Sequence, residues 1–246
     1  MLRVGYLFLC LAAVASALAG PPFVTDDPEP VDLHHWEVYI SSQWARDSGG
    51  ITGDLPHLEV NYGAAPNLQL HLIVPYEFAR PVGGPTSRGL GDIELGVKYR
   101  FVRETAHRPM IGVFPLFELP TGDEDRGLGT GHLHVFLPVW LQKSRGSWTS
   151  YGGGGYWINP GEGNQDYWLF GGLIQKDLSQ HLTLGGEIVH TGATEVGGES
   201  DLFFNLGGQY NFNDEHHLLF SAGRSIEGSS EFLGYLGFQW TFPTAD

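Results

Sequence analysis

Apolar and polar side chains alternate along this 246-residue chain almost without interruption from Trp36 to Phe242. In GDIELGVKYRF, residues 91–101, the charged side chains share one parity, and Ile, Leu, Val, Tyr and Phe share the other. A period of two is typical of β-strands, whose successive side chains point to opposite faces of a sheet. About twelve such runs follow one another, each near the roughly 9 to 11 residues that a tilted membrane strand needs. The sequence therefore predicts an all-β protein.

The connections between the runs alternate in length. Those after odd-numbered runs, such as PTGDEDRGLGTG, are Gly-rich and mostly long and acidic, whereas those after even-numbered runs, such as AAP and NDE, are shorter. Outer-membrane barrels have long outer loops and short periplasmic turns, whereas a β-sandwich with Greek-key connections would not keep this order. We therefore expect a transmembrane, antiparallel, up-and-down β-barrel of about 12 strands over residues 36–242, followed by a C-terminal tail, residues 243–246.

The first 19 residues predict a signal peptide, because Arg3 precedes an apolar run that ends in the small-residue pattern of Ala17 and Ala19. This peptide would direct the chain across the inner membrane, and we expect its destination to be the cell outer membrane. The only cysteine, Cys10, lies within it. Residues 20–35 are rich in proline and acidic side chains, which predicts an irregular segment. This segment is either a periplasmic tail or a plug inside the barrel.

The charge of the chain restricts its partners. Loss of Arg3 with the signal peptide leaves 12 basic and 28 acidic residues, a formal net charge of −16, which argues against a nucleic-acid partner. The last run, FLGYLGFQWTF, resembles the carboxyl-terminal assembly signal of outer-membrane proteins, although PTAD follows it. The expected partners are outer-membrane lipids, the barrel-assembly machinery during biogenesis, and a small-molecule solute.

Aromatic side chains gather near the ends of the runs. Rings at this position predict the girdles that membrane barrels place at the two interfaces. The residues are Trp36, Trp44, Tyr62, Tyr76, Phe78, Tyr99, Phe101, Trp157, Tyr167, Trp168, Tyr210, Phe212, Trp240 and Phe242.

The polar parity of the runs predicts the interior of the barrel. We expect the following side chains to line the lumen: Glu59, His71, Glu77, Asp92, Glu94, Lys98, Arg100, Glu118, His132, His134 and Glu187. Facing acidic and basic groups in a narrow lumen select solutes by charge and size. Alternatively, these groups pair with one another and fill a sealed barrel. Parity leaves open the orientation of the Gly-rich seventh run, residues 147–158, and of the eleventh, residues 216–225.

Catalytic and metal-binding patterns are weak. His132 and His134 form an H-x-H pair on one expected strand face, but no third ligand is fixed. Asp123–Asp125 lacks the regular acidic spacing of a dedicated calcium loop. A lipid-cleaving barrel enzyme needs a serine beside an outward histidine, and only His190 is expected to point outward. We therefore expect no enzymatic activity, no cofactor and no metal site.

Several stretches together resemble one known family. GPPFVTDDPEP after the signal, HWE opening a strand, GLGDIELGVKYRF and the loop PTGDEDRGLGTG are similar to the putative phenol meta-pathway degradation family of outer-membrane transporters. The resemblance covers essentially the whole mature chain, and it implies a barrel that passes small hydrophobic or aromatic molecules.

The first functional hypothesis is therefore a channel or transporter for such molecules. The alternatives are a structural or adhesive outer-membrane barrel with a sealed lumen, a lipid-modifying barrel enzyme, and a soluble periplasmic β-protein.

Overall fold

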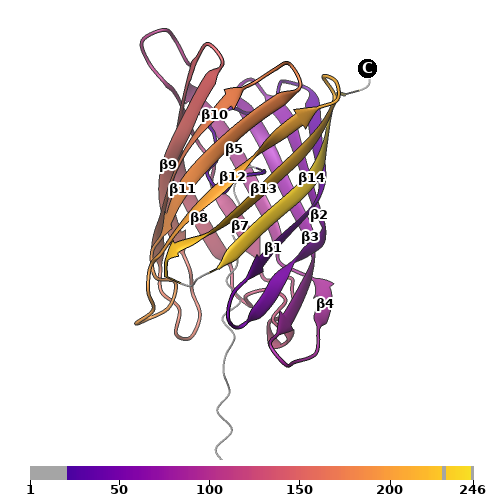
Figure 1. The fold of residues 1–246 in the computed structure, drawn as a ribbon, viewed down its shortest axis with the longest axis vertical. Coiled ribbons are helices and arrows are strands. Elements are labelled where there is room, and N and C mark those ends of the chain that lie inside the picture. The colour runs from indigo at the N-terminus through magenta and orange to yellow at the C-terminus, as the bar shows by residue number, and fades with distance from the viewer. Residues whose placement is uncertain (1–20, 229–230, 245–246) are drawn as a thin grey trace, which may run out of the picture.

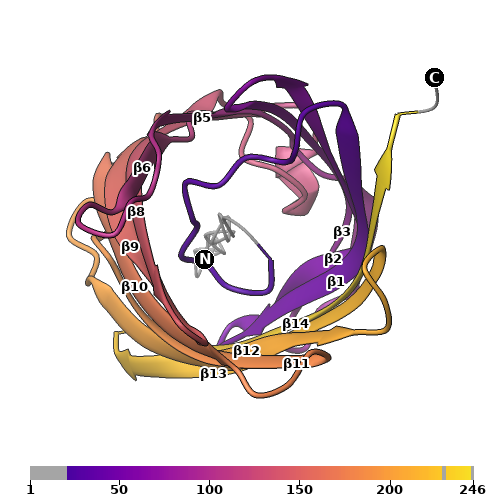
Figure 2. The ribbon, with the colours of Figure 1, turned by 90° about the horizontal axis from the view of Figure 1, so that it is seen from above.

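The protein folds into a closed antiparallel β-barrel with strands tilted to its axis (Figures 1 and 2). The computed structural model describes residues 21–228 and 231–244. The predicted signal peptide and the last two residues of the predicted tail lie outside these ranges. The strands are β1 (His35–Arg46), β2 (Gly50–Ala65), β3 (Leu68–Pro81), β4 (Ser87–Leu90), β5 (Ile93–Val102), β6 (Met110–Val113), β7 (Leu116–Leu119), β8 (His134–Arg145), β9 (Trp148–Ile158), β10 (Tyr167–Asp177), β11 (Leu182–Thr191), β12 (Asp201–Asn211), β13 (His216–Glu227) and β14 (Phe232–Pro243).

The fourteen hydrogen-bonded segments amount to twelve strands. β4 and β5 both pair with β3 and are separated only by Gly91 and Asp92, so they form one interrupted strand. β6 and β7 both lie between β5 and β8 and are separated by Phe114 and Pro115. Proline has no N–H to donate to the ladder, which accounts for the second interruption. β1 pairs with β14 and closes the sheet. The predicted twelve-stranded, up-and-down barrel is confirmed.

The alternation of β5 gives the barrel its two surfaces. Leu95 exposes 42% of its surface, and Tyr99 and Phe101 are also exposed, whereas Glu94 exposes 7% and Lys98 is equally buried. Large apolar side chains are likewise exposed on the other strands, among them Ile40, Phe170 and Leu236. An apolar outer surface of this extent fits lipid, because soluble proteins rarely expose large contiguous apolar patches.

The first long loop is shorter than the sequence suggested. RDSGGITGDLP, residues 46–56, is one of the long Gly-rich connections that follow odd-numbered runs, but Arg46 pairs with Ile51 and Ala45 with Thr52, so the hairpin leaves only residues 47–49 unpaired. β2 tolerates Pro56 because its register shifts between Asp54 and His57, where the ladder needs no proline N–H.

Two residues of the predicted aromatic girdle face the interior instead. Trp157 in β9 exposes 1% of its surface, and Tyr167 packs against the same buried cluster. The glycines before Trp157 hid its parity from the sequence. The structure also settles the eleventh run: Leu219 faces inward in β13, whereas Ala222 and Arg224 face outward.

The turn between β5 and β6 is fixed by one ion pair. Lys143 Nζ donates to Glu104 Oε1 at 2.8 Å. This bond and a further one from the Ser144 N–H hold the pKa of Glu104 below its ordinary value.

None of the described residues belongs to a helix long and apolar enough to cross a bilayer.

Candidate lumen site

The segment before β1 lies inside the barrel, where Figure 2 shows it crossing the lumen. Glu187 on β11 accepts hydrogen bonds from the backbone N–H groups of Val24, at 2.9 Å, and Thr25, at 2.8 Å. Gln69 on β3 accepts one from Val31 at 2.9 Å. Buried backbone N–H groups need partners, and here barrel side chains supply them, since the segment forms no ladder.

Ion pairs also hold the N-terminal segment in the lumen. Lys98 Nζ lies 3.0 Å from Asp26 Oδ1, and both side chains are almost fully buried. Arg100 Nη1 lies 3.5 Å from Glu29 Oε1, nearer the end of β5. The two basic residues of GDIELGVKYRF are therefore bound to the acidic residues of the N-terminal segment. Neither the alternation of residues 91–101 nor the composition of residues 20–35 predicted these ion pairs.

One side of the interior carries carboxylates and histidines. His71 on β3 joins Glu94 on β5, with Nε2 to Oε1 at 2.8 Å, and its Nδ1 lies 2.7 Å from Asn61 Oδ1. His57 Nδ1 lies 2.9 Å from Asp54 Oδ2, both on β2. Each of these histidines has a neighbouring carboxylate, so they belong to a buried polar network.

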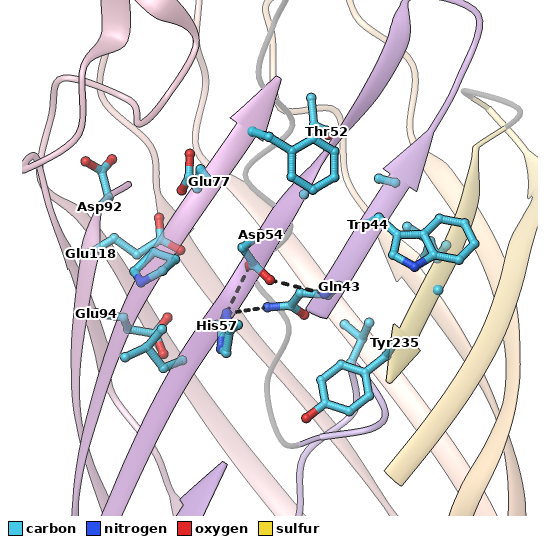
Figure 3. Close-up of a pocket in the computed structure, with 18 of the residues that line it drawn as sticks. Gln43, Trp44, Thr52, Asp54, His57, Glu77, Asp92, Glu94, Glu118 and Tyr235 are labelled. Atoms are coloured by element: carbon cyan, nitrogen blue, oxygen red, sulfur yellow. Dashed lines mark hydrogen bonds and ion pairs between the residues drawn. The ribbon is translucent and has the colours of Figure 1, made fainter. Parts of the chain in front are cut away.

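A cavity of about 140 Å³ opens beside this network. Figure 3 shows Glu94, Glu118 and Asp92 on one side of it, with Gln43 and Tyr235 on the other. Among the described residues that line the cavity there are five carboxylates and no lysine or arginine, so its electrostatic character is acidic. An apolar cavity of about 150 Å³ holds one benzene molecule, so this volume suits a single small ring or an aliphatic group of similar size.

The opposite side of the interior is apolar and aromatic. Phe136 stacks on Trp157 with ring centroids 4.7 Å apart, and Trp157 stacks on Tyr167 at 6.1 Å. Trp140 meets the edge of Phe136 at 6.4 Å. We call this set the aromatic wall. Val24 of the N-terminal segment belongs to the same buried cluster, so the segment covers part of the wall.

Ten of the eleven predicted lumen residues fall into three groups. Glu59, His71, Glu94, Lys98, His134 and Glu187 are buried on the inner face. Glu77, Arg100 and Glu118 are inward and partly buried. Asp92 lies in the break between β4 and β5, where it accepts hydrogen bonds from Gly122 and Thr130. Asp92 therefore fixes the loop 120–133.

The predicted H-x-H face does not exist. β8 begins at His134, whereas His132 is exposed in the preceding loop and bonds Thr130 O through Nδ1 at 3.2 Å. The two rings therefore do not share a strand face, because the strand ladder starts between them. Within residues 21–228 and 231–244, no group of three or more His, Cys, Asp or Glu side chains is arranged to hold a metal ion.

Sequence reasoning missed the aromatic wall, although its parity was visible. Phe136 and Trp140 share the parity of His134, which we predicted to line the lumen. Only polar side chains were predicted to line the lumen, so Phe136 and Trp140 were not among them. No such signal existed for Trp157, because glycines occupy the positions before it.

His190 offers no catalytic arrangement. It is exposed on the outer face of β11, and its cross-strand neighbours are Phe170 and Leu202, neither of which has a nucleophilic group.

A twelve-stranded antiparallel barrel with an apolar exterior defines the fold class of outer-membrane β-barrels. No family model matches the chain, and no curated protein matches it in sequence. Solved structures match its fold. One is an outer membrane channel from Pseudomonas putida F1, with a TM-score of 0.71 and 16% identity, covering 88% of this chain and 98% of the channel.

Two further structures share the fold at lower similarity. The KdgM porin in complex with disordered oligogalacturonate has a TM-score of 0.58 and 12% identity, covering 83% of this chain and 99% of the porin. The CymD monoaromatic hydrocarbon channel has a TM-score of 0.51 and 8% identity, covering 86% of this chain and 89% of that channel.

Proposed function

We propose that the chain is an outer-membrane channel for small hydrophobic or aromatic molecules, and that residues 21–33 act as its plug. The aromatic wall carries this proposal. A sealed barrel is free to fill its interior with any well-packed side chains, whereas a path for apolar solutes needs an apolar surface that continues along the lumen. Phe136, Trp140 and Trp157 supply that surface from two adjacent strands.

The plug is held by polar contacts, which suits a reversible closure. Residues 23–26 are buried. Two barrel side chains provide their main polar contacts: Glu187 accepts hydrogen bonds from the backbone of Val24 and Thr25, and Lys98 pairs with Asp26. Each barrel strand is held by a continuous ladder of backbone hydrogen bonds, whereas the plug forms no such ladder. Release of the plug therefore requires few bonds to break and leaves the barrel intact.

The family resemblance and one structural neighbour support the choice of solute. The sequence resembles the phenol meta-pathway family, and the CymD structure is described as a monoaromatic hydrocarbon channel. The outer membrane, its lipids and the assembly machinery are proposed as location and partners on the same basis, together with the apolar exterior.

Planar bilayer recordings test the channel directly. Mature protein should show low conductance, and a variant lacking residues 21–31 should show a several-fold higher conductance, because the lumen has lost its plug. Liposome uptake of toluene or phenol should rise in the same variant. Heat-modifiable gel mobility confirms that both barrels are folded.

A barrel lacking residues 196–199 provides the control, since these residues are exposed in another outer loop. It should conduct as the full chain does. If the plug-deleted barrel is folded but neither conducts nor takes up solute, the channel proposal is wrong and the sealed structural or adhesive barrel replaces it.

A further inference from the structure

Arginines form a row on the outside of the barrel at the end that carries the long loops. Arg46, Arg80, Arg88 and Arg224 are all exposed and share the outward parity of their strands. They are four of the 12 basic residues that follow the predicted signal peptide. In a chain with so large an acidic excess, this placement of basic side chains is unusual.

The strand register aligns these arginines. Phe232 on β14 pairs with Arg224 on one side and with Arg46 on the other. Ile51 on β2 likewise pairs with both Arg46 and Arg80. Arg88 on β4 pairs with Phe78, two residues before Arg80 on β3. Arg224, Arg46 and Arg80 are therefore each separated by one intervening strand, a spacing of about 10 Å, whereas Arg80 and Arg88 lie on the adjacent strands β3 and β4. We call these four residues the arginine belt.

The depth of the belt follows from the aromatic rings beside it. Trp44 stacks on Phe232 at 5.4 Å, and Tyr76 is exposed on β3. Arg46 lies two residues beyond Trp44 on the same face, and a strand rises about 3.3 Å per residue, so it lies about 7 Å further along the tilted strand and further from the membrane centre. Aromatic rings mark the interface of a barrel, which places the belt among lipid headgroups.

The belt arginines lack close ion-pair partners among the described residues. Within the described part of the chain, none of its four guanidinium groups has a carboxylate oxygen within ion-pair distance, whereas Lys98 and Arg100 in the lumen both do. Exposed guanidinium groups at headgroup depth are available to phosphate, which arginine binds with two parallel hydrogen bonds.

A groove of about 370 Å³ lies under two members of the belt, on the outer surface of β2, β3 and β4. Ile51, Leu55, Tyr76 and Phe78 supply its apolar surface, and Glu77, Arg80, Thr86 and Arg88 supply its polar side chains. The two guanidinium groups outnumber the single carboxylate, so apolar walls beside a net positive charge match an acyl chain attached to a phosphorylated headgroup.

We propose that the arginine belt and this groove bind the phosphorylated glycolipid of the outer leaflet through its phosphate groups. The inference rests on the membrane location in the proposed function but not on transport, so a barrel without channel activity leaves it unaffected.

Native mass spectrometry of the folded, detergent-purified protein tests the proposal. The probes are lipid A with both phosphates and the same lipid after enzymatic removal of its phosphates. Wild-type protein should prefer the phosphorylated form. Replacement of all four belt arginines by glutamine should weaken its binding by at least about tenfold and leave binding of the dephosphorylated form unchanged.

The matched control replaces Arg103, Arg108, Arg145 and Lys176 by glutamine, which removes the same charge from the opposite end of the barrel. It should bind phosphorylated lipid A within about twofold of wild type. Equal binding of both lipids by wild type, or an equal loss in both variants, would overturn the proposal.

A smaller change guards against misfolding. Arg80→Gln with Arg88→Gln alters only the groove, and Arg80→Lys with Arg88→Lys keeps the charge but removes the paired donors. The glutamine pair should lose phosphorylated lipid and the lysine pair should retain part of it. If the glutamine pair binds as wild type does, the groove is not the site.

Discussion

At the scale of single residues, position along the barrel axis decides what a substitution costs. Leu95 pairs with Leu72, which lies midway between Leu68 and Tyr76 on the lipid-facing side of β3. Phe101 lies at the far end of β5, beyond Tyr99. Both side chains point outward, so they differ mainly in depth.

Leu95→Arg should therefore destabilise the folded barrel by about 2 to 4 kcal/mol, because it puts a charge at the bilayer midplane. Phe101→Arg, near the interface, should cost about 0 to 1 kcal/mol for its charge. Urea titrations of both variants in liposomes measure the difference. Equal costs would mean that the outer surface is not embedded in lipid.

At the scale of elements, the N-terminal segment is a short chain held by a few bonds inside a rigid wall. Lys98 is central to its position, since it contacts Asp26 at 3.0 Å and Asp27 at 3.9 Å. Removing one partner of a buried ion pair leaves an uncompensated charge, a loss of about 3 to 5 kcal/mol. The barrel does not need this pair, but the segment does.

Lys98→Met should consequently release the segment from the lumen. Thr25 is fully buried, and the expected mature chain contains no cysteine, so Thr25→Cys provides a unique site for maleimide. Labelling should be slow in the otherwise unchanged chain and many-fold faster with Lys98→Met. Adding Asp26→Asn should restore part of the protection, because the buried charge is then removed. Unchanged labelling would show that other bonds hold the plug.

At the scale of the whole molecule, the interior is divided into an acidic side and an aromatic side. The acidic side has Glu77, Glu94 and Glu118 at the cavity, and the inward-facing Lys98 and Arg100 pair with the plug. Fixed negative charge in a narrow lumen raises the local concentration of cations.

The conducting, plug-deleted barrel should accordingly prefer potassium over chloride. Glu94→Gln with Glu118→Gln should reduce this preference measurably while leaving heat-modifiable mobility unchanged. Reversal potentials across a potassium chloride gradient give the ratio. Glu162→Gln, in an outer loop, is the control and should leave the ratio as it was. An unchanged ratio in the lumen variant would remove these carboxylates from the ion path.

The sequence by itself determined the twelve strands and the two surfaces of most of them, because a period of two is a local property that each run carries. The same alternation predicted that Glu94 and Lys98 point inward, and both side chains are buried in the structure. The orientation of Trp157 was not predicted, because the glycines before it have no side chains to show an alternation. The prediction for His132 was wrong, because the first residue of a strand depends on where pairing with the neighbouring strand begins.

Only the tertiary structure decided where the nonperiodic residues 21–33 lie, since their bonds to Glu187 and Lys98 join positions far apart in the chain. The alignment of Arg46, Arg80, Arg88 and Arg224 in one row was likewise decided by register. The physical reason is the same in both cases: alternation fixes the face of a side chain, whereas contacts across strands fix its neighbours.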